Sequence, residues 1–378
     1  MADRLQADVV IVGGGIAGAS VAANLASDAS IVLVEREVTL AHHSTGRSAA
    51  AFLESYGGPA IRALTQASRA ELEAAPDDGE TPPLLSPRAL LWLARVDQRA
   101  LLDALARRVP SLSVLDEASA RAVCPVLRPG YVAAAGYEPD AADIDVLALH
   151  GRFVRTARRA GAVVRTSAGV VAITADGTGD SHGWRMDLSD GATVSAGVLV
   201  NAAGAWADRI ASMAGAPAVG LRPLRRTIAI GRPRGTALDP HGPLLSDIGE
   251  GFYCKPEGPN VLLSPADETP TEPCDVRPDE LDVAIAIERV NKATLYDIAS
   301  VVTTWSGLRT FAPDRNLVVG FDASVPGLFW LAGQGGYGIQ TSPALGRVAA
   351  ALIVGRDVPD DVVAAGLDVA SLRPGRFG

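Results

Sequence analysis

The sequence predicts an α/β protein with a Rossmann-like nucleotide-binding domain and a second domain built on a mixed, mainly antiparallel sheet. Three observations support this prediction: a strand, glycine turn, helix and strand near the N-terminus, a similar rhythm after residue 145, and a strand-rich segment between residues 219 and 311. The 378 residues suggest two domains, and a hydrophobic content of 48% suffices for a sizeable core.

Residues 8–36 contain the pattern on which this fold class mainly depends. A short β-branched run precedes Gly13, Gly15 and Gly18, which form the G-x-G-x-x-G arrangement typical of dinucleotide sites. The first glycine permits a tight turn, the second lets the backbone approach a pyrophosphate, and the third allows close packing of helix on strand. Glu35 ends the following strand, where a carboxylate can bind both ribose hydroxyls. The pattern predicts a dinucleotide site and leaves FAD and NAD open.

Hydrophobic periodicity predicts the other elements. Helical spacing occurs in six segments, namely 59–74, 97–109, 116–123, 145–160, 278–292 and the run from the loop at 333–341 to residue 352. Short apolar or alternating runs predict strands at 89–94, 131–137, 163–165, 170–173, 184–188, 193–195, 198–201, 317–319 and 328–332. The βα rhythm after residue 145 indicates that the chain returns to the nucleotide-binding domain.

Charge and composition argue against several classes of partner. The 34 basic and 43 acidic residues give a net charge of −9 without a block of like charges, which argues against nucleic acid or anionic membranes. The N-terminus lacks the apolar core of a signal peptide, so we expect a cytoplasmic protein. The longest uncharged run, at 323–346, carries glycines and prolines that do not suit a transmembrane segment. Three cysteines without Cys-x-x-Cys spacing, and His42 and His43 without a third ligand, predict neither disulfide nor metal site.

Several motifs, in order along nearly the whole chain, resemble those of the FAD-dependent D-amino acid oxidase and dehydrogenase superfamily, which also holds glycine and sarcosine oxidases. These motifs are Val-Gly-Gly-Gly-Ile-Ala-Gly-Ala-Ser at 12–20, Ser-Thr-Gly-Arg-Ser-Ala-Ala at 44–50, Asn-Ala-Ala-Gly-Ala-Trp at 201–206, Trp-Ser-Gly-Leu-Arg at 305–309 and Gly-Gln-Gly-Gly-Tyr-Gly-Ile-Gln at 333–340. The bacterial D-arginine dehydrogenases are the most similar subfamily, through the segments 43–50, 84–88, 225–226, 252–253, 307–309 and 334–341.

The resemblance implies FAD rather than NAD. It implies non-covalent binding, because Gly307 stands where monomeric sarcosine oxidases have the cysteine that anchors the flavin. It also implies a discontinuous FAD-binding domain from residues 1–56, 141–218 and 303–378, and a substrate-binding domain from 57–140 and 219–302. The residues expected to bind FAD are Gly13, Gly15, Ile16, Ala17, Gly18, Glu35, Arg36, Ser44, Thr45, Arg47, Ser48, Ala49, Ala50, Val171, Ala203, Gly204, Gly307, Gly333, Gly335, Gly336, Tyr337, Gly338, Ile339 and Gln340.

Oxidation of an amino acid requires its carboxylate to be held while the Cα hydrogen faces the flavin. Arginine presents a planar fork that matches a carboxylate. The resemblance assigns this clamp to Arg226 and Arg309. Arg309 lies in an otherwise apolar strand, which argues against a solvent-exposed position for it. Arg225 points the other way in a strand and is the competing surface residue.

Three further residues match the active site of the family. The resemblance implies that Tyr56 and Tyr253 close over the substrate carboxylate, and ordinary amphipathic core packing is the alternative for both. Gly336 matches the glycine whose carbonyl accepts the substrate amine, and its alternative role is only to shape a loop beside the flavin.

Two departures from the arginine enzymes bear on the substrate. Leu90 stands where those enzymes have a glutamate that receives the guanidinium, and Leu244 extends the apolar wall. An unpaired buried guanidinium would be costly, so we expect apolar or aromatic D-amino acids, or a broad range, rather than arginine. Ala51 replaces the histidine of the family near the flavin, which leaves no obvious side-chain base.

The sequence thus predicts a flavoenzyme that oxidises D-amino acids to imino acids, which hydrolyse to 2-oxo acids and ammonia. Its partners would be a small amino acid and an electron acceptor, which could be a quinone, a carrier or oxygen. The same fold could instead take glycine, a secondary amine or a 2-hydroxy acid. A NAD-linked dehydrogenase and a non-catalytic flavin-binding protein are the alternatives from other classes.

Overall fold

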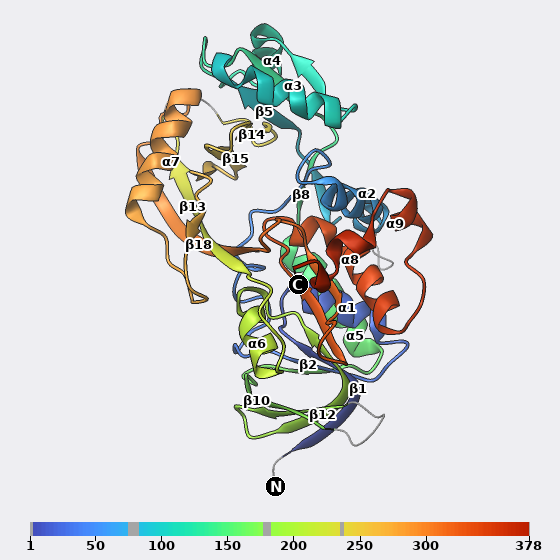
Figure 1. Ribbon diagram of the computed structural model, residues 1–378. Coiled ribbons are helices and arrows are strands. Elements are labelled where there is room, and N and C mark those ends of the chain that lie inside the picture. Colours follow the sequence, from blue (N-terminus) through green and yellow to red (C-terminus); the bar gives the residue numbers. More distant parts are fainter. Residues whose placement is uncertain (1–2, 75–82, 177–182, 235–237, 378) are drawn as a thin grey trace.

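The computed structural model describes residues 3–74, 83–176, 183–234 and 238–377. The chain forms two large sheets in two parts of the molecule (Figure 1). The first sheet lies in the part that holds both termini. The second lies between helix α7 (Glu280–Ala293) and the helices α3 (Arg99–Arg108) and α4 (Glu117–Val123).

The first sheet has a parallel core of five strands. In spatial order they are β20 (Leu328–Ala332), β12 (Thr193–Asn201), β1 (Arg4–Val12), β2 (Ile31–Val34) and β9 (Val163–Arg165). Strand β19 (Val318–Phe321) adds to β20 in antiparallel register, and the hairpin of β10 (Val170–Ala175) and β11 (Trp184–Leu188) adds to β12. The four residues of β2 are all buried, which explains their uninterrupted apolar sequence.

Helices cover both faces of this sheet. On one face α1 (Ile16–Leu25) packs between α5 (Val146–Arg159) and α8 (Gly338–Ile353). Helix α2 (Pro59–Glu73) packs against α8 and α9 (Asp360–Ala364). On the other face α6 (Ala207–Met213) packs against β12. Because successive side chains of a strand alternate between faces, Val9 and Ile11 of β1 join one core, and Val10 and Val12 join the other.

The glycine turn has the geometry that the sequence predicts. Gly13 has a φ of +113°, and a Cβ atom there would lie 2.4 Å from the carbonyl oxygen of Ala202. A Cβ atom on Gly18 would lie 1.9 Å from the carbonyl oxygen of Gly13. The first position therefore needs glycine for its turn, and the third needs it for the close approach of α1 to β1.

The second sheet is mixed and mainly antiparallel, as predicted. Its strands are, in spatial order, β17 (Thr269–Pro270), β13 (Arg222–Arg232), β16 (Asn260–Ser264), β15 (Tyr253–Glu257), β14 (Leu244–Asp247), β5 (Leu90–Ala94), β7 (Ala134–Glu138) and β6 (Ser113–Leu115). The pair of β14 and β5 is parallel, and the other described pairs are antiparallel. A small sheet of β3 (Ala51–Phe52), β8 (Ala142–Ile144) and β4 (Leu85–Pro87) completes the fold.

Strand β18 (Ser300–Phe311) pairs with β13 along its whole length, and it therefore belongs to the second sheet. It runs across the boundary predicted at residues 302 and 303. The domain boundaries themselves remain predictions. The strand predicted at 131–137 begins at Ala134, because Tyr131 and its neighbours lie in a turn.

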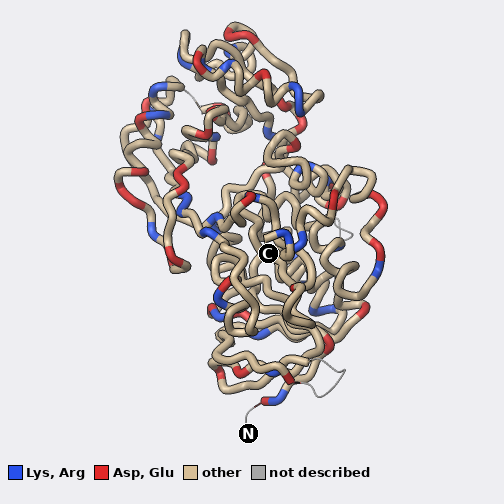
Figure 2. The backbone as a smooth tube through the Cα atoms, in the orientation of Figure 1, with Lys and Arg blue, Asp and Glu red and all other residues tan. Residues whose placement is uncertain are grey.

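Acidic and basic residues are interspersed along both parts of the molecule (Figure 2). This distribution agrees with the absence of a like-charge block in the sequence. Within the described ranges, no helix combines the length and the apolar character that a membrane span needs.

Gly18→Ala should destabilise the protein by about 1–3 kcal/mol, because the new methyl group forces α1 away from the turn. Urea unfolding followed by circular dichroism measures this loss. Gly375→Ala is the matched control, since the nearest atom to its Cβ is 3.9 Å away. Equal unfolding midpoints for the two variants would contradict the packing role of Gly18.

Candidate functional site

A long cavity runs from the start of α1 to the inner face of the second sheet. It brings together most residues that the sequence singles out. Those that line it are Gly15, Ile16, Ala17, Ser44, Thr45, Arg47, Ser48, Ala49, Ala50, Ala51, Tyr56, Gly204, Arg226, Leu244, Tyr253, Gly307, Arg309, Gly335, Gly336, Gly338, Ile339 and Gln340. The structure does not place nine others on its wall, namely Gly13, Gly18, Glu35, Arg36, Leu90, Val171, Ala203, Gly333 and Tyr337.

Glu35 supports the glycine turn in this structure. Its carboxylate accepts hydrogen bonds from the backbone N–H groups of Gly14 at 2.8 Å and Glu37 at 2.9 Å. The turn is held from the other side by His150, whose Nε2 lies 2.9 Å from the carbonyl oxygen of Gly14. Because a carbonyl can only accept, Nε2 carries the proton. Binding of a ribose by Glu35 stays a prediction.

Two helices begin at the cavity, and neither is capped by the side chain of its own N-cap residue. The first turns of these helices, α1 and α8, contain no acidic residue. Thr45 Oγ1 accepts a hydrogen bond of 3.0 Å from the backbone N–H of Ile16. The positive ends of both helix dipoles and their remaining N–H groups therefore face the cavity, which fits the anionic and hydrogen-bond-accepting groups of a flavin dinucleotide.

The loop at residues 44–50 is fixed to the second sheet. Ser44 Oγ donates to the carbonyl oxygen of Leu308 at 2.6 Å, and Arg47 donates to the carbonyl oxygen of Ser306 at 3.3 Å. In return, Trp305 Nε1 donates to the carbonyl oxygen of Arg47 at 2.9 Å. Much of the hydrogen-bonding capacity of Arg47 is therefore used within the protein, where it joins the two sheets at the cavity.

The cavity contains a guanidinium without an acidic partner. Arg309 Nη1 donates to the hydroxyl of Tyr56 at 3.1 Å, and within the described ranges Arg309 makes no ion pair. A Cβ atom on Gly336 would lie 2.8 Å from Arg309 Nη1, so the guanidinium rests directly against this glycine. The predicted clamp residue therefore points into the cavity with hydrogen-bond donors available.

Arg226 lies in the same cavity and is 5% exposed. Its Nε donates to the carbonyl oxygen of Asp267 at 2.8 Å, and its Nη2 lies 3.4 Å from Glu268 Oε1. Burial and the charge of Arg309 lower the pKa of Arg226. The nearby like charge makes a bound anion favourable.

Arg225 points to the opposite side of β13. It pairs with Asp282 at 2.8 Å and with Asp279 at 3.4 Å, both at the start of α7. The alternation of a strand thus separates the two adjacent arginines as expected. Arg225 attaches the helix to the sheet, and Arg226 faces the cavity.

The wall on the second sheet is less apolar than the sequence suggests. Leu244 lines the cavity, but Leu90 is fully buried in a core cluster. Sequence reasoning missed two polar residues that line the cavity, Lys255 on this sheet and Asp143 on β8 of the small sheet. The position of Lys255, two residues after Tyr253 on the same strand face, is a signal that could have found it. Other lining residues not singled out from the sequence are Leu53, Trp92, Ala202, Ile228, Ser246, Glu250, Leu262, Ala266, Leu308, Thr310 and Gln334.

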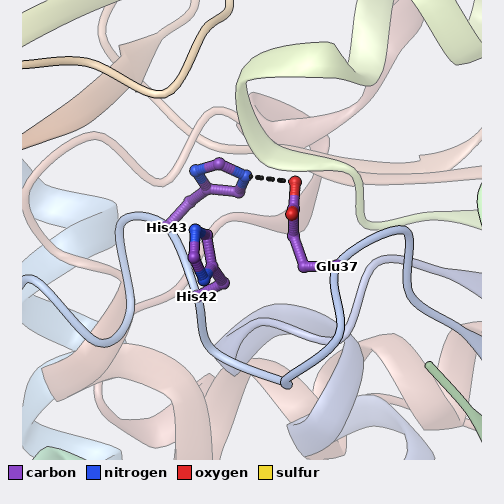
Figure 3. Close-up of side chains that lie close together, drawn as sticks. All are labelled: Glu37, His42 and His43. Carbon is purple, nitrogen blue, oxygen red and sulfur yellow. Dashed lines mark hydrogen bonds and ion pairs between the residues drawn. The ribbon is translucent and has the colours of Figure 1, made fainter. Parts of the chain in front are cut away.

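Glu37, His42 and His43 bring their potential ligand atoms within 4.8 Å of one another (Figure 3). His43 Nε2 lies 2.9 Å from Glu37 Oε1, and Arg36 Nη2 donates to the same oxygen at 2.8 Å. The guanidinium already neutralises this carboxylate and would repel a metal ion. We therefore propose no metal at this cluster.

A parallel nucleotide-type sheet with a cavity at the start of its first helix is typical of dinucleotide-binding proteins. Residues 8–352 match the DAO family of FAD-dependent oxidoreductases, and the chain belongs to that family. FAD is accordingly its cofactor, and the paired helix N-termini suit it. The finer resemblance to D-arginine dehydrogenases stays a prediction.

Two curated relatives are longer than this chain. FAD-dependent oxidoreductase domain-containing protein 1 of Xenopus laevis is 34% identical over 183 residues, which cover 43% of this chain and 36% of that protein. The mitochondrial dimethylglycine dehydrogenase of Mus musculus is 26% identical over 409 residues, which cover 99% of this chain and 44% of that protein. The chain thus spans less than half the length of either relative.

Two solved structures share the fold over nearly the whole chain. Glycine oxidase from Geobacillus kaustophilus superposes with a TM-score of 0.81 at 23% identity and covers 98% of both chains. L-proline dehydrogenase from P. horikoshii also gives a TM-score of 0.81, at 20% identity, over 100% of this chain and 98% of that one. These matches concern architecture.

His150→Gln should make the protein less sensitive to acid. Burial lowers the pKa of His150 below its ordinary value of 6.5. The unfolded chain therefore takes up a proton that the folded chain disfavours, so stability is fully present above about pH 6.5 and falls as the pH drops towards the lowered pKa. The drop in Tm between about pH 7.5 and pH 5 should be smaller in the variant. His241→Gln, at an exposed site, should behave as the wild type. An equal drop in all three proteins would contradict this role.

Proposed function

We propose that the protein is a cytoplasmic FAD-dependent dehydrogenase or oxidase of D-amino acids. The products would be imino acids, which hydrolyse to 2-oxo acids and ammonia. The observation that carries this proposal is the cavity-facing guanidinium of Arg309, which has no acidic partner among the described residues and lies beside a second buried arginine. The D enantiomer is supported by the sequence motifs that resemble D-amino acid enzymes.

A substrate carboxylate would complete the charge balance of this part of the cavity. Two arginines close enough to influence each other are costly to bury together, and an anion between them offsets that cost. Each charge-assisted hydrogen bond to the carboxylate contributes about 1.5–3 kcal/mol. Arg226 and Arg309 would therefore both bind the carboxylate and fix the orientation of Cα.

Tyr56 and Tyr253 would exclude water from the reacting centre. Tyr56 already bonds to Arg309, and its ring lies 4.8 Å from that of Tyr337. The carbonyl of Gly336 would accept a hydrogen bond from the substrate amine. Bound FAD supplies the hydride acceptor. We expect it to be held non-covalently, since Gly307 offers no thiol.

A second candidate function is oxidation of glycine or of a secondary or tertiary amine. The dimethylglycine dehydrogenase relative matches 99% of this chain, and this observation favours such substrates. Glycine and amino acids with a substituted amine carry the same carboxylate and would use the same two arginines. They differ at the amine, so only substrate tests separate the two functions.

Anaerobic titration of the purified protein should bleach its flavin absorbance near 450 nm with D-amino acids and not with their L enantiomers, since the flavin is the hydride acceptor. The same titration with glycine, dimethylglycine, L-proline and a 2-hydroxy acid serves as the comparison. Bleaching by dimethylglycine alone would replace the proposal with the second candidate. Absence of bleaching by every compound would favour a non-catalytic protein. Stopped-flow reoxidation by oxygen or a quinone then identifies the acceptor.

Arg309→Met should lower kcat/KM for the best substrate at least tenfold, because the carboxylate loses a charge-assisted hydrogen bond. The flavin content should stay close to that of the wild type. Arg232→Met is the matched control, since Arg232 lies at the exposed end of β13. Equal kinetics in the two variants would contradict the proposed clamp.

A further inference from the structure

An ion-pair network at the cavity joins Lys255 of the second sheet to Asp143 of the small sheet. Lys255 Nζ lies 2.8 Å from Asp143 Oδ1, and Arg88 Nε donates to Asp143 Oδ2 at 2.5 Å. Lys255 is only 8% exposed, and both Lys255 and Asp143 are cavity-lining residues. Buried lysines are rare and require a reason, since burial disfavours an ammonium ion.

The lysine lies on the same wall as the proposed substrate site. Tyr253 and Lys255 are two residues apart on β15, so their side chains share a face, and their Cα atoms are roughly 6–7 Å apart. Lys255 pairs with Leu262 in the neighbouring strand, and Leu244 lies on the next strand. Both leucines line the cavity. The two leucines therefore flank Lys255 on the strands at either side, so the ammonium group is the polar element of an otherwise apolar stretch of this wall.

The internal partners do not use all the donors of Lys255. An ammonium group has three N–H donors. Asp143 accepts one, and Glu257 Oε2 lies 3.3 Å away on a side chain that is half exposed. Both oxygens of Asp143 are already bonded to cations, so this carboxylate is shared between Lys255 and Arg88. The network carries two positive and two negative charges, and one of the negative charges, that of Glu257, lies on a half-exposed side chain.

We propose that Lys255 is a specificity residue that binds a hydrogen-bond acceptor at the end of the substrate side chain. This inference rests on the proposed function and specifies its substrate class: amino acids whose side chains end in a carboxamide or a carboxylate. An ammonium or guanidinium group on the substrate would face the ammonium group of Lys255 and is disfavoured. The side-chain site therefore selects neither arginine nor a purely aliphatic side chain.

Substrate pairs of equal shape test this inference. Glutamine and homoleucine differ in that methyl groups replace the amide oxygen and nitrogen. We expect wild-type kcat/KM to be higher for glutamine or glutamate than for homoleucine, and lowest for lysine. In Lys255→Met the ratio of glutamine to homoleucine should fall at least tenfold through loss of one charge-assisted hydrogen bond. Lys292→Met, on an exposed lysine of α7, is the matched control and should keep the wild-type ratio.

The possible outcomes are distinct. A variant that slows both substrates equally leaves the ratio unchanged, which would indicate a structural role and overturn the proposal. Wild-type preference for homoleucine would overturn it too. If Lys255→Met fails to retain FAD, Lys255→Gln keeps a donor and should give an intermediate ratio. If no amino acid reduces the flavin, the proposed function itself is wrong. If amino acids reduce the flavin without preference for their side chains, only the role of Lys255 is wrong.

Discussion

The arrangement of the site depends on the positive charge of Arg309, a partly buried residue that faces the cavity. This guanidinium is held by a tyrosine hydroxyl and rests against Gly336, and no described carboxylate neutralises it. Arg226 adds a second charge from the neighbouring strand, and its own carbonyl and glutamate contacts compensate it only in part. Holding two cationic side chains close together in a cavity costs free energy, and a bound anion offsets part of that cost.

The fold could be predicted from sequence where local constraints are strong. Gly13 and Gly18 occupy positions that no larger residue fits, and the apolar strand before them can be buried only between two layers of helices. The alternation of β13 likewise separates Arg225 from Arg226 without further information. Such features depend on neighbouring residues in the chain or on a single motif, so they can be predicted from the sequence.

The cavity wall around Leu244 and Lys255 could be predicted only in part, because it depends on contacts between distant segments. Leu90 and Leu244 are paired in the parallel strands β5 and β14, yet Leu90 is fully buried in a core cluster and does not line the cavity. Asp143 meets Lys255 although 112 residues separate them. The hydrophobic periodicity of a sequence does not reveal which distant polar residues form an ion pair. The extent of β18 and the hydrogen bonds of Glu35 to the glycine turn likewise depend on contacts between segments that are distant in the sequence.

The hydrogen bond from Ser44 to the carbonyl of Leu308 has a mechanical consequence. Leu308 is the neighbour of Arg309 along β18, whereas Ser44 belongs to the loop that lies beside the start of α1. A displacement of that loop is therefore transmitted through one peptide unit to the backbone of Arg309, the residue that we propose binds the substrate carboxylate. The loop beside the expected cofactor site and the strand that carries the proposed carboxylate clamp are thus mechanically coupled, so a shift of one also displaces the other.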